Sequence, residues 1–429
     1  MKEIARNQYL DQLIERQGNG LIKIITGVRR CGKSYLLFEL FRKYLLNSGI
    51  KQEQIISLQL DDDNNISYRN PDVLSSYLNS RIINSDEIFY VLLDEAQLAI
   101  SDEEYKGKGI IRLYGILNGL LNRKNVEVYI TGSNSKFLSS DIMTEFRGRG
   151  DEIHVNPLSF SEFMSVYDGD VYSGYQEYSM FGGLPLVLSE KTVERKSKYL
   201  IDLFKNTYIK DIIERHDLRG DTVIETLTDV LASDVSSLTN PSKIANTFCS
   251  HSIKTNEKTI STYIDYLIDA FLISKAQRYD VKGKKYIGSP FKYYFTDIGL
   301  RNARLNFRQI EPTHSMENII YNELLLRGFN VDVGVVNQYT KNAKGQNNIT
   351  KLEVDFVCNK GSKRYYIQSA YSIPDKEKLE QEQASFDRIG DSFKKIIVVQ
   401  DNIMPWYTEK GYLIINLFDF LLKPNSLEL

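Results

Sequence analysis

Two glycines, a lysine and a serine near the N-terminus have the spacing of a loop that binds phosphate groups. Residues 27–34 read GVRRCGKS, after an apolar, β-branched run at 21–26 and before an apolar pattern at helical spacing. Glycines let the backbone turn tightly, so that consecutive N–H groups point at one anion, and the following helix adds the positive end of its dipole. The alternative is a glycine turn with an ordinary surface lysine, but strand, loop and helix all agree with the phosphate loop.

This loop predicts the binding of ATP together with Mg²⁺. Lys33 would neutralise the β- and γ-phosphates, and the Ser34 hydroxyl would be a ligand of Mg²⁺. The residues that we expect to bind ATP are Gly27, Val28, Arg29, Arg30, Cys31, Gly32, Lys33, Ser34 and Tyr35.

A second segment supplies the carboxylates that ATP hydrolysis needs. Residues 88–95 read IFYVLLDE, a continuous apolar run of the kind found in strands buried on both faces of a parallel sheet. The run ends in two carboxylates, where α/β sheets place their ligands. We expect Asp94 to hold Mg²⁺ and Glu95 to orient and deprotonate the attacking water. Because the base lies beside the metal ligand, hydrolysis is favoured over phosphoryl transfer to a small acceptor.

A fourth strand, expected at 126–130, ends in polar residues, and it completes a recognisable order of segments. The order GVRRCGKS, VLLDE, YITGSNS and EFRGRG resembles that of the AAA+ ATPases. The resemblance implies a γ-phosphate sensor at Asn134 or Ser133 and an arginine finger at Arg149, ahead of Arg147. Such an arginine often reaches the nucleotide of a neighbouring subunit, which implies a homo-oligomer. The alternative for these arginines is a basic loop before a fifth strand at 152–155.

The pattern becomes helical from 157 to 215 and contains GGLP at 182–185. This element resembles the glycine-x-proline motif that some ATPase switches place beside the nucleotide. An equally good interpretation is a turn that breaks a helix.

The middle of the chain, 221–300, has the order of helices and strands expected of a winged helix. We expect helices near 223–232, 242–248 and 258–271 and strands at 273–279 and 286–295. The turn between the two strands is basic, so it could contact DNA phosphates while the third helix faces a groove. Candidate DNA contacts are Lys258, Thr259, Lys282, Lys284 and Lys285. The alternative is that this region is a lid or a protein-docking module, because a winged helix can serve as either.

The last region has the order helix, three strands, helix, strand, which resembles the PD-(D/E)XK nucleases. The resemblance places Glu317 on the first helix and Asp355 on a strand as remnants of a metal site. Gln368 and Ala370 stand where that fold carries an acid and a lysine. We therefore expect a degenerate site that does not cut DNA. A lysine relocated to 376 or 378 is the alternative.

The whole layout resembles one subgroup of bacterial and archaeal AAA+ ATP-binding proteins, whose C-terminal domain is an uncharacterised relative of the nuclease fold. The expected fold is therefore α/β in three parts. These are an AAA+ type P-loop ATPase domain with a parallel sheet and a helical lid (1–215), a winged-helix domain (216–305) and a nuclease-like domain (306–429).

Composition limits the location and the partners. The 429 residues carry a net charge of −2, so any contact with nucleic acid must come from a local patch. Three scattered cysteines fit a reducing cytoplasm, and no apolar run is long enough to span a membrane.

The function that we expect is ATP hydrolysis, with the nucleotide state controlling how the C-terminal domains engage a partner. That partner is double-stranded DNA or a protein. The alternatives are an ATP-bound scaffold for protein interactions with little turnover, and an ATP-dependent nuclease. The intact Glu95 favours turnover over a pure scaffold.

Overall fold

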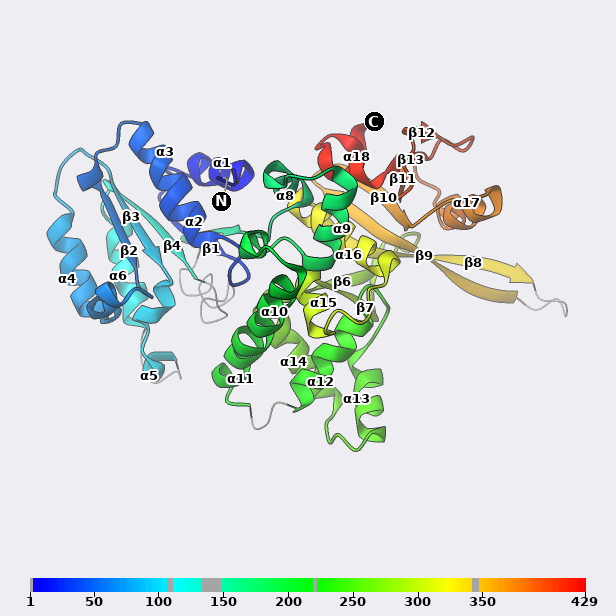
Figure 1. The fold of residues 1–429 in the computed structure, drawn as a ribbon, viewed down its shortest axis with the longest axis horizontal. Helices are drawn as coiled ribbons and strands as arrows, with labels where there is room; N and C mark the ends of the chain where they lie inside the picture. The colour runs from blue at the N-terminus through cyan, green and yellow to red at the C-terminus, as the bar shows by residue number, and fades with distance from the viewer. Residues whose placement is uncertain (1–2, 106–110, 133–147, 219–221, 342–346) are drawn as a thin grey trace. The chain divides into compact units, whose positions relative to one another are not determined.

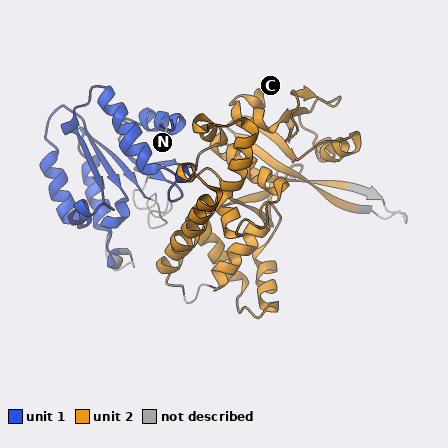
Figure 2. Ribbon diagram, viewed as in Figure 1, with its two compact units in different colours: residues 1–157, 184–186 blue, residues 158–183, 187–429 orange. Residues whose placement is uncertain are grey.

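The described part of the chain forms two compact units. The computed structural model describes residues 3–105, 111–132, 148–218, 222–341 and 347–429 (Figure 1). Unit 1 comprises residues 1–157 and 184–186, and unit 2 comprises residues 158–183 and 187–429 (Figure 2).

The division between the units differs from the expected end of the first domain at 215. The helices that follow residue 157 pack within unit 2, because their aromatic side chains join its core. Phe160, Phe163 and Tyr175 are buried and cluster with Ile320 and Phe356 of the C-terminal region. Burial of three aromatic side chains outweighs proximity in sequence in deciding which unit these helices join.

Unit 1 contains a five-stranded parallel sheet with the order β2-β3-β4-β1-β5. Its strands are β1 (Ile22–Thr26), β2 (Ile55–Gln59), β3 (Phe89–Asp94), β4 (Val126–Thr131) and β5 (Gly150–His154). Every residue of β1, β3 and β4 is buried, including Lys23 of β1 and Glu127 of β4, whose side chains form a salt bridge with each other. The expectation of a parallel α/β sheet is confirmed.

Helices lie along this sheet (Figure 1). Those that the structure describes are α1 (Asn7–Glu15), α2 (Lys33–Tyr35), α3 (Arg42–Asn47), α4 (Pro71–Arg81), α5 (Asp102–Tyr105) and α6 (Arg112–Leu121). A π-helical segment, Leu36–Phe41, joins α2 to α3, so one continuous helical stretch follows the glycine loop. Because all five strands are parallel, their carboxyl ends meet at one edge of the sheet.

Unit 2 contains an eight-stranded mixed sheet with the order β12-β13-β11-β10-β9-β8-β6-β7. Its strands are β6 (Ile273–Asp280), β7 (Lys285–Phe295), β8 (Asn330–Lys341), β9 (Asn347–Lys360), β10 (Lys363–Ala370), β11 (Lys394–Val399), β12 (Trp406–Tyr407) and β13 (Leu413–Asn416). Its described helices are α8 (Phe160–Val166), α9 (Val171–Phe181), α10 (Val193–Leu203), α11 (Lys210–Arg215), α12 (Thr222–Ser233), α13 (Pro241–Ser250), α14 (Glu257–Asp269), α15 (Ile298–Arg304), α16 (Pro312–Leu326), α17 (Lys376–Gln383) and α18 (Leu417–Leu422).

The hairpin β6–β7 is the edge of this sheet and does not stand alone as a wing. Strand β6 pairs in parallel with β8 over Arg278–Asp280. At the turn, the Val281 N–H donates to the Val335 carbonyl (3.2 Å), and the Val281 side chain is buried. One sheet therefore crosses the domain boundary that the sequence predicts at 305.

The helices expected in the middle of the chain are present as α12, α13 and α14. Asn256 caps α14, since its side chain accepts from the Thr259 N–H. Whether this arrangement is a winged helix stays a prediction. None of the helices in the described ranges is long and apolar enough to cross a membrane.

Candidate functional site

The glycine loop follows β1 and rests against the end of β5. Gly27 has φ +137° and Gly32 has φ +103°, both in the left-handed region where side chains are strained. A Cβ added to Gly27 would lie 2.1 Å from the Val155 carbonyl oxygen. No side chain fits at this position, so the spacing seen in the sequence has a steric cause.

Lys33 begins the helical stretch and is buried within unit 1. Its ammonium donates to the carbonyl oxygens of Gly27 (2.9 Å) and Val28 (3.1 Å), so it lies against the loop that it follows. Burial, with a smaller effect of the Lys33 charge, lowers the pKa of His154 to about 4. His154 is therefore neutral near pH 7, whereas the Lys33 ammonium is held against the loop.

A buried carboxylate lies where β3 ends. Asp94 accepts hydrogen bonds from the hydroxyls of Ser34 and Thr131, and its side chain has no salt bridge within the described ranges. Burial raises the pKa of Asp94 above its usual range. A desolvated carboxylate beside a hydroxyl oxygen fits Mg²⁺, a hard cation that takes oxygen ligands. Asp94 and Ser34 would hold it, as the sequence predicts.

Glu95 is the next residue, and its backbone is left-handed at φ +49°. Its N–H donates to the Thr131 hydroxyl (3.2 Å), and the Gln97 amide donates to its carboxylate. A non-glycine residue in this conformation is strained, and such strain is concentrated at functional positions. The sequence indicated Thr131 only as part of the polar end of the fourth strand, and it gave no signal for Gln97.

The remaining predicted residues of unit 1 divide into two groups. Arg149 directly precedes β5, and its carbonyl accepts from the Ile22 N–H (2.9 Å) at the start of β1. Arg149 is exposed and lies at the edge of the sheet opposite the glycine loop, about 17 Å away along a five-residue strand. Asn134, together with Ser133 and Arg147, lies outside the described residues.

Two segments distant in sequence touch the loop. Arg6, which is 2% exposed, donates to the carbonyls of Cys31 (3.0 Å) and Asn156 (2.7 Å). A Cβ at Gly32 would lie 3.8 Å from the Pro185 ring. The GGLP element therefore has its proline beside the phosphate loop. Arg6 carried no sequence signal, because a single arginine before a helix is common.

In unit 2, the structure brings Glu317 and Asp355 together around a lysine that the sequence did not indicate. The Lys292 ammonium lies 2.8 Å from Glu317 Oε1, 2.7 Å from Glu353 Oε1 and 3.6 Å from Asp355 Oδ1. The Lys292 side chain is only 4% exposed. Gln368 is adjacent, because its side-chain oxygen accepts from the Asp355 N–H (3.4 Å).

We call Lys292, Glu317, Glu353 and Asp355 the acidic cluster. Burial and the Glu317 charge raise the pKa of Asp355 to about 8, although Lys292 opposes this shift. Within the described residues no group of His, Cys, Asp and Glu is arranged to hold a metal ion. Lys378, a predicted relocated lysine, pairs with Glu382 on its own helix (2.6 Å).

The candidate DNA contacts are mostly exposed. Lys258, Lys282, Lys284 and Lys285 face solvent, whereas the Thr259 hydroxyl is committed to the helix cap at Asn256 (3.3 Å). Since the hairpin turn is fixed to β8, its three lysines have a defined position on the edge of the sheet.

Comparison with known proteins agrees with the geometry of unit 1. A family model described as an AAA domain matches residues 19–164, and one described as a domain of unknown function matches residues 172–311. The fold and the site therefore define a protein with an AAA-type P-loop ATPase domain. The chain belongs to the same family as an uncharacterized protein of Haemophilus influenzae, 33% identical over 401 residues, which cover 92% of this chain and 93% of that protein.

More distant similarities are also found. An uncharacterized protein of Methanocaldococcus jannaschii is 28% identical over 373 residues, which cover 83% of this chain and 76% of that protein. The solved structure of a Walker-type ATPase of Pyrococcus abyssi is similar at 16% identity and a TM-score of 0.43, covering 71% of this chain and 96% of that one. A winged helix and a nuclease-like domain stay predictions.

The acidic cluster predicts a pH-dependent stability. An Asp355 pKa of about 8 in the folded protein lies above the ordinary value of 3.8, so the unfolded chain loses this proton first as pH rises. The free energy of unfolding should therefore fall by up to about 1.4 kcal/mol per pH unit between these two pKa values. The Asn side chain of Asp355→Asn does not titrate, so this variant should not lose stability in this way as pH rises. Its free energy of unfolding relative to the wild type should therefore increase between about pH 5 and about pH 8.

Urea denaturation at several pH values measures this difference. Glu380→Gln, which removes an exposed carboxylate on α17, is the matched control and should show no such trend. A stability difference for Asp355→Asn that is the same at every pH would mean that Asp355 is ionised in the folded protein throughout.

Proposed function

We propose that this protein binds ATP with Mg²⁺ at residues 27–35 and hydrolyses it to ADP and phosphate. The observation that carries the proposal is the buried Asp94, hydrogen-bonded to Ser34 directly after the loop that Lys33 contacts. The loop, the carboxylate and the adjacent Glu95 come from β1 and β3, whose carboxyl ends share one edge of the sheet. This combination matches the requirements of phosphoryl transfer to water.

Each residue has a separate role in this proposal. The backbone N–H groups of the loop and Lys33 bind the β- and γ-phosphates, while Ser34 and Asp94 hold Mg²⁺. The metal supplies charge neutralisation for the phosphate oxygens. Glu95 accepts the proton of the attacking water, and this requires that it exchange its hydrogen bond from Gln97 for one from water.

Variants of the loop and of the base should separate binding from turnover. Lys33→Ala should lose ATP binding, because the cation against the loop is removed. Glu95→Gln should bind ATP with unchanged affinity and lose hydrolysis, because the amide cannot accept the proton. Fluorescent-nucleotide binding and phosphate release measure the two steps. Wild-type turnover in Glu95→Gln would show that Glu95 is not the base.

We also propose that hydrolysis requires assembly of two or more chains. Arg149 lies at the opposite edge of its own sheet from the loop, which supports a role at the nucleotide of a neighbouring chain and not at its own. Arg149→Ala should bind ATP normally and lose roughly 10³- to 10⁵-fold in turnover. Wild-type specific activity should rise with protein concentration, and activity that is independent of concentration in a monomer would contradict this idea.

The nucleotide state could control unit 2 through the chain that connects the units. Within unit 1, Pro185 lies beside the phosphate loop. Within unit 2, the Gly183 N–H donates to the buried carboxylate of Asp297 (2.7 Å). Because two peptide bonds separate these anchored residues, a movement of the loop strains a fixed point of unit 2. We propose that this controls the engagement of a partner, DNA or protein.

The scaffold and nuclease alternatives have less support. An ATP-bound scaffold with little turnover does not account for Glu95 and its strained backbone. A nuclease needs a metal among its carboxylates, whereas in the acidic cluster the Lys292 ammonium occupies that place.

If the partner is duplex DNA, the basic turn should contact its phosphates. Replacing Lys282, Lys284 and Lys285 together by Ala should weaken binding and reduce the salt dependence by about 0.9 in slope per lost contact. Electrophoretic mobility or anisotropy at several salt concentrations measures both effects. An affinity for DNA that changes neither with these mutations nor with the salt concentration would indicate a protein partner.

A further inference from the structure

A pocket of about 700 Å³ opens in unit 2 where two neighbouring strands separate. Strands β6 and β8 pair only at Arg278–Asp280 against Val333–Val335. Before this point, Lys275 and Gln277 of β6 line one side of the pocket, and β8 lines the other. The volume is within the range of pockets that bind small molecules.

Aromatic side chains form much of the lining. Tyr279 and Tyr286 stand edge to face with ring centroids 5.5 Å apart, and Tyr286 is 61% exposed. The Tyr286 hydroxyl donates to the buried carboxylate of Asp332 (3.2 Å), which fixes the ring at the pocket. A fixed and exposed tyrosine ring offers a face on which a flat ligand can stack.

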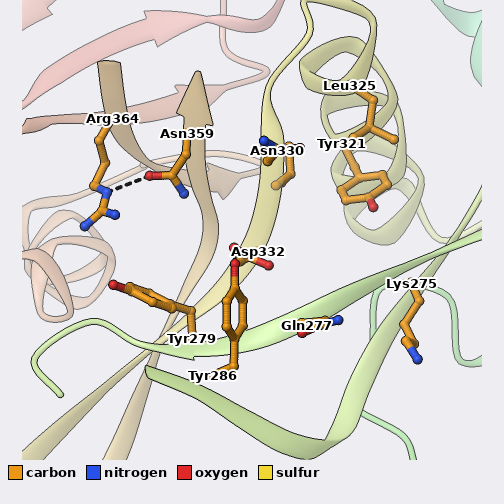
Figure 3. Close-up of a pocket in the computed structure, with 11 residues that line it drawn as sticks. Lys275, Gln277, Tyr279, Tyr286, Tyr321, Leu325, Asn330, Asp332, Asn359 and Arg364 are labelled. Carbon is orange, nitrogen blue, oxygen red and sulfur yellow. Dashed lines mark hydrogen bonds between the residues drawn. The ribbon is translucent and has the colours of Figure 1, made fainter. Parts of the chain in front are cut away.

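The two cations of the lining lie on opposite sides of these tyrosines (Figure 3). Arg364 is oriented by Asn359, to which its Nε–H donates (2.7 Å), and by the Tyr279 ring, 5.6 Å away. Lys275 lies over the Phe291 ring at 4.6 Å. Neither cation has a salt bridge within the described ranges of the chain, so both charges remain available to a ligand.

A further tyrosine, largely buried, also lines this space. Tyr321 of α16 lines the pocket and is only 3% exposed. Its ring stacks on Tyr294, with centroids 3.9 Å apart, but its hydroxyl has no hydrogen-bond partner among the residues that the structure describes. Because this hydroxyl is not fully enclosed by protein, it can form a hydrogen bond with a ligand in the pocket.

We propose that this pocket binds a nucleoside that carries phosphate on both its 5′ and its 3′ side. The base stacks on Tyr286, one phosphate contacts Arg364, and the other contacts Lys275. Asp332 and the Tyr321 hydroxyl bond the polar groups of the sugar or base. A segment of single-stranded nucleic acid and a free nucleoside bisphosphate share this chemistry.

Other anions satisfy the lining less well. An acidic peptide would pair with the two cations but would leave the tyrosine face without a flat partner. Inorganic phosphate would contact only one cation. The site goes beyond the proposed ATP hydrolysis, because it lies within unit 2 and needs no turnover.

The test measures binding in the full chain with the Lys33→Ala background, so that the ATP loop does not contribute. Thymidine 3′,5′-bisphosphate is titrated by calorimetry, and a labelled short oligothymidylate by anisotropy. Arg364→Ala and Lys275→Ala should each weaken binding by roughly tenfold or more. For the strand, each should also reduce the salt slope by about 0.7. Lys376→Ala, which removes an exposed lysine outside the pocket, should change neither.

Tyr321→Phe separates a binding role from a structural one. Since the hydroxyl is unpaired in the free protein, its removal should leave the melting temperature unchanged or raise it. The same variant should weaken ligand binding by roughly fivefold to tenfold. A structural role would lower the melting temperature and leave binding unaltered.

Comparing the two ligands shows whether the pocket binds a nucleic-acid strand or a free nucleotide. Binding of both, lost in the pocket variants, supports a nucleic-acid strand, and binding of the bisphosphate alone supports a free nucleotide. The proposal is overturned if neither ligand binds, if the pocket variants bind as well as Lys376→Ala, or if an acidic peptide of equal charge displaces either ligand.

Discussion

The buried carboxylate of Asp94 connects the parts of unit 1 on which its chemistry depends. It accepts from Ser34, which follows the glycine loop, and from Thr131, which ends β4. Thr131 in turn accepts from the Glu95 N–H. Three segments of the sheet edge are therefore held in register by hydrogen bonds to one desolvated group. A change in the charge beside Asp94 would therefore affect the loop, Glu95 and the end of β4 together.

In unit 2, buried carboxylates are compensated by a buried lysine and not by hydroxyl groups alone. Its acidic cluster has three carboxylates around the single ammonium of Lys292, and that ammonium is itself almost fully buried. Removing the lysine would leave uncompensated negative charge, which is among the costliest changes in a protein interior. The two buried sites thus differ in kind. Asp94 has hydroxyl partners and fits an added cation, whereas the acidic cluster already contains its own.

Unit 2 combines in one sheet strands that the sequence placed in two different domains. Because β6 and β7 belong to the same sheet as β8 to β13, the basic turn and the tyrosine-lined pocket lie on one scaffold. The turn is fixed where β6 and β8 pair, and the pocket opens where they do not. A short pairing between two long strands therefore creates both a rigid edge and a cavity.

The sequence by itself determined the phosphate loop, the carboxylates after β3, the parallel sheet and most strand positions. These depend on short-range spacing: glycines where no Cβ fits, and apolar runs where a strand is buried. Only the tertiary structure decided that helices after 157 join unit 2, that β6 joins the C-terminal sheet, and that Lys292 meets Glu317 and Asp355. Those outcomes depend on contacts between residues far apart in the chain. No local pattern encodes which buried lysine will face which carboxylate.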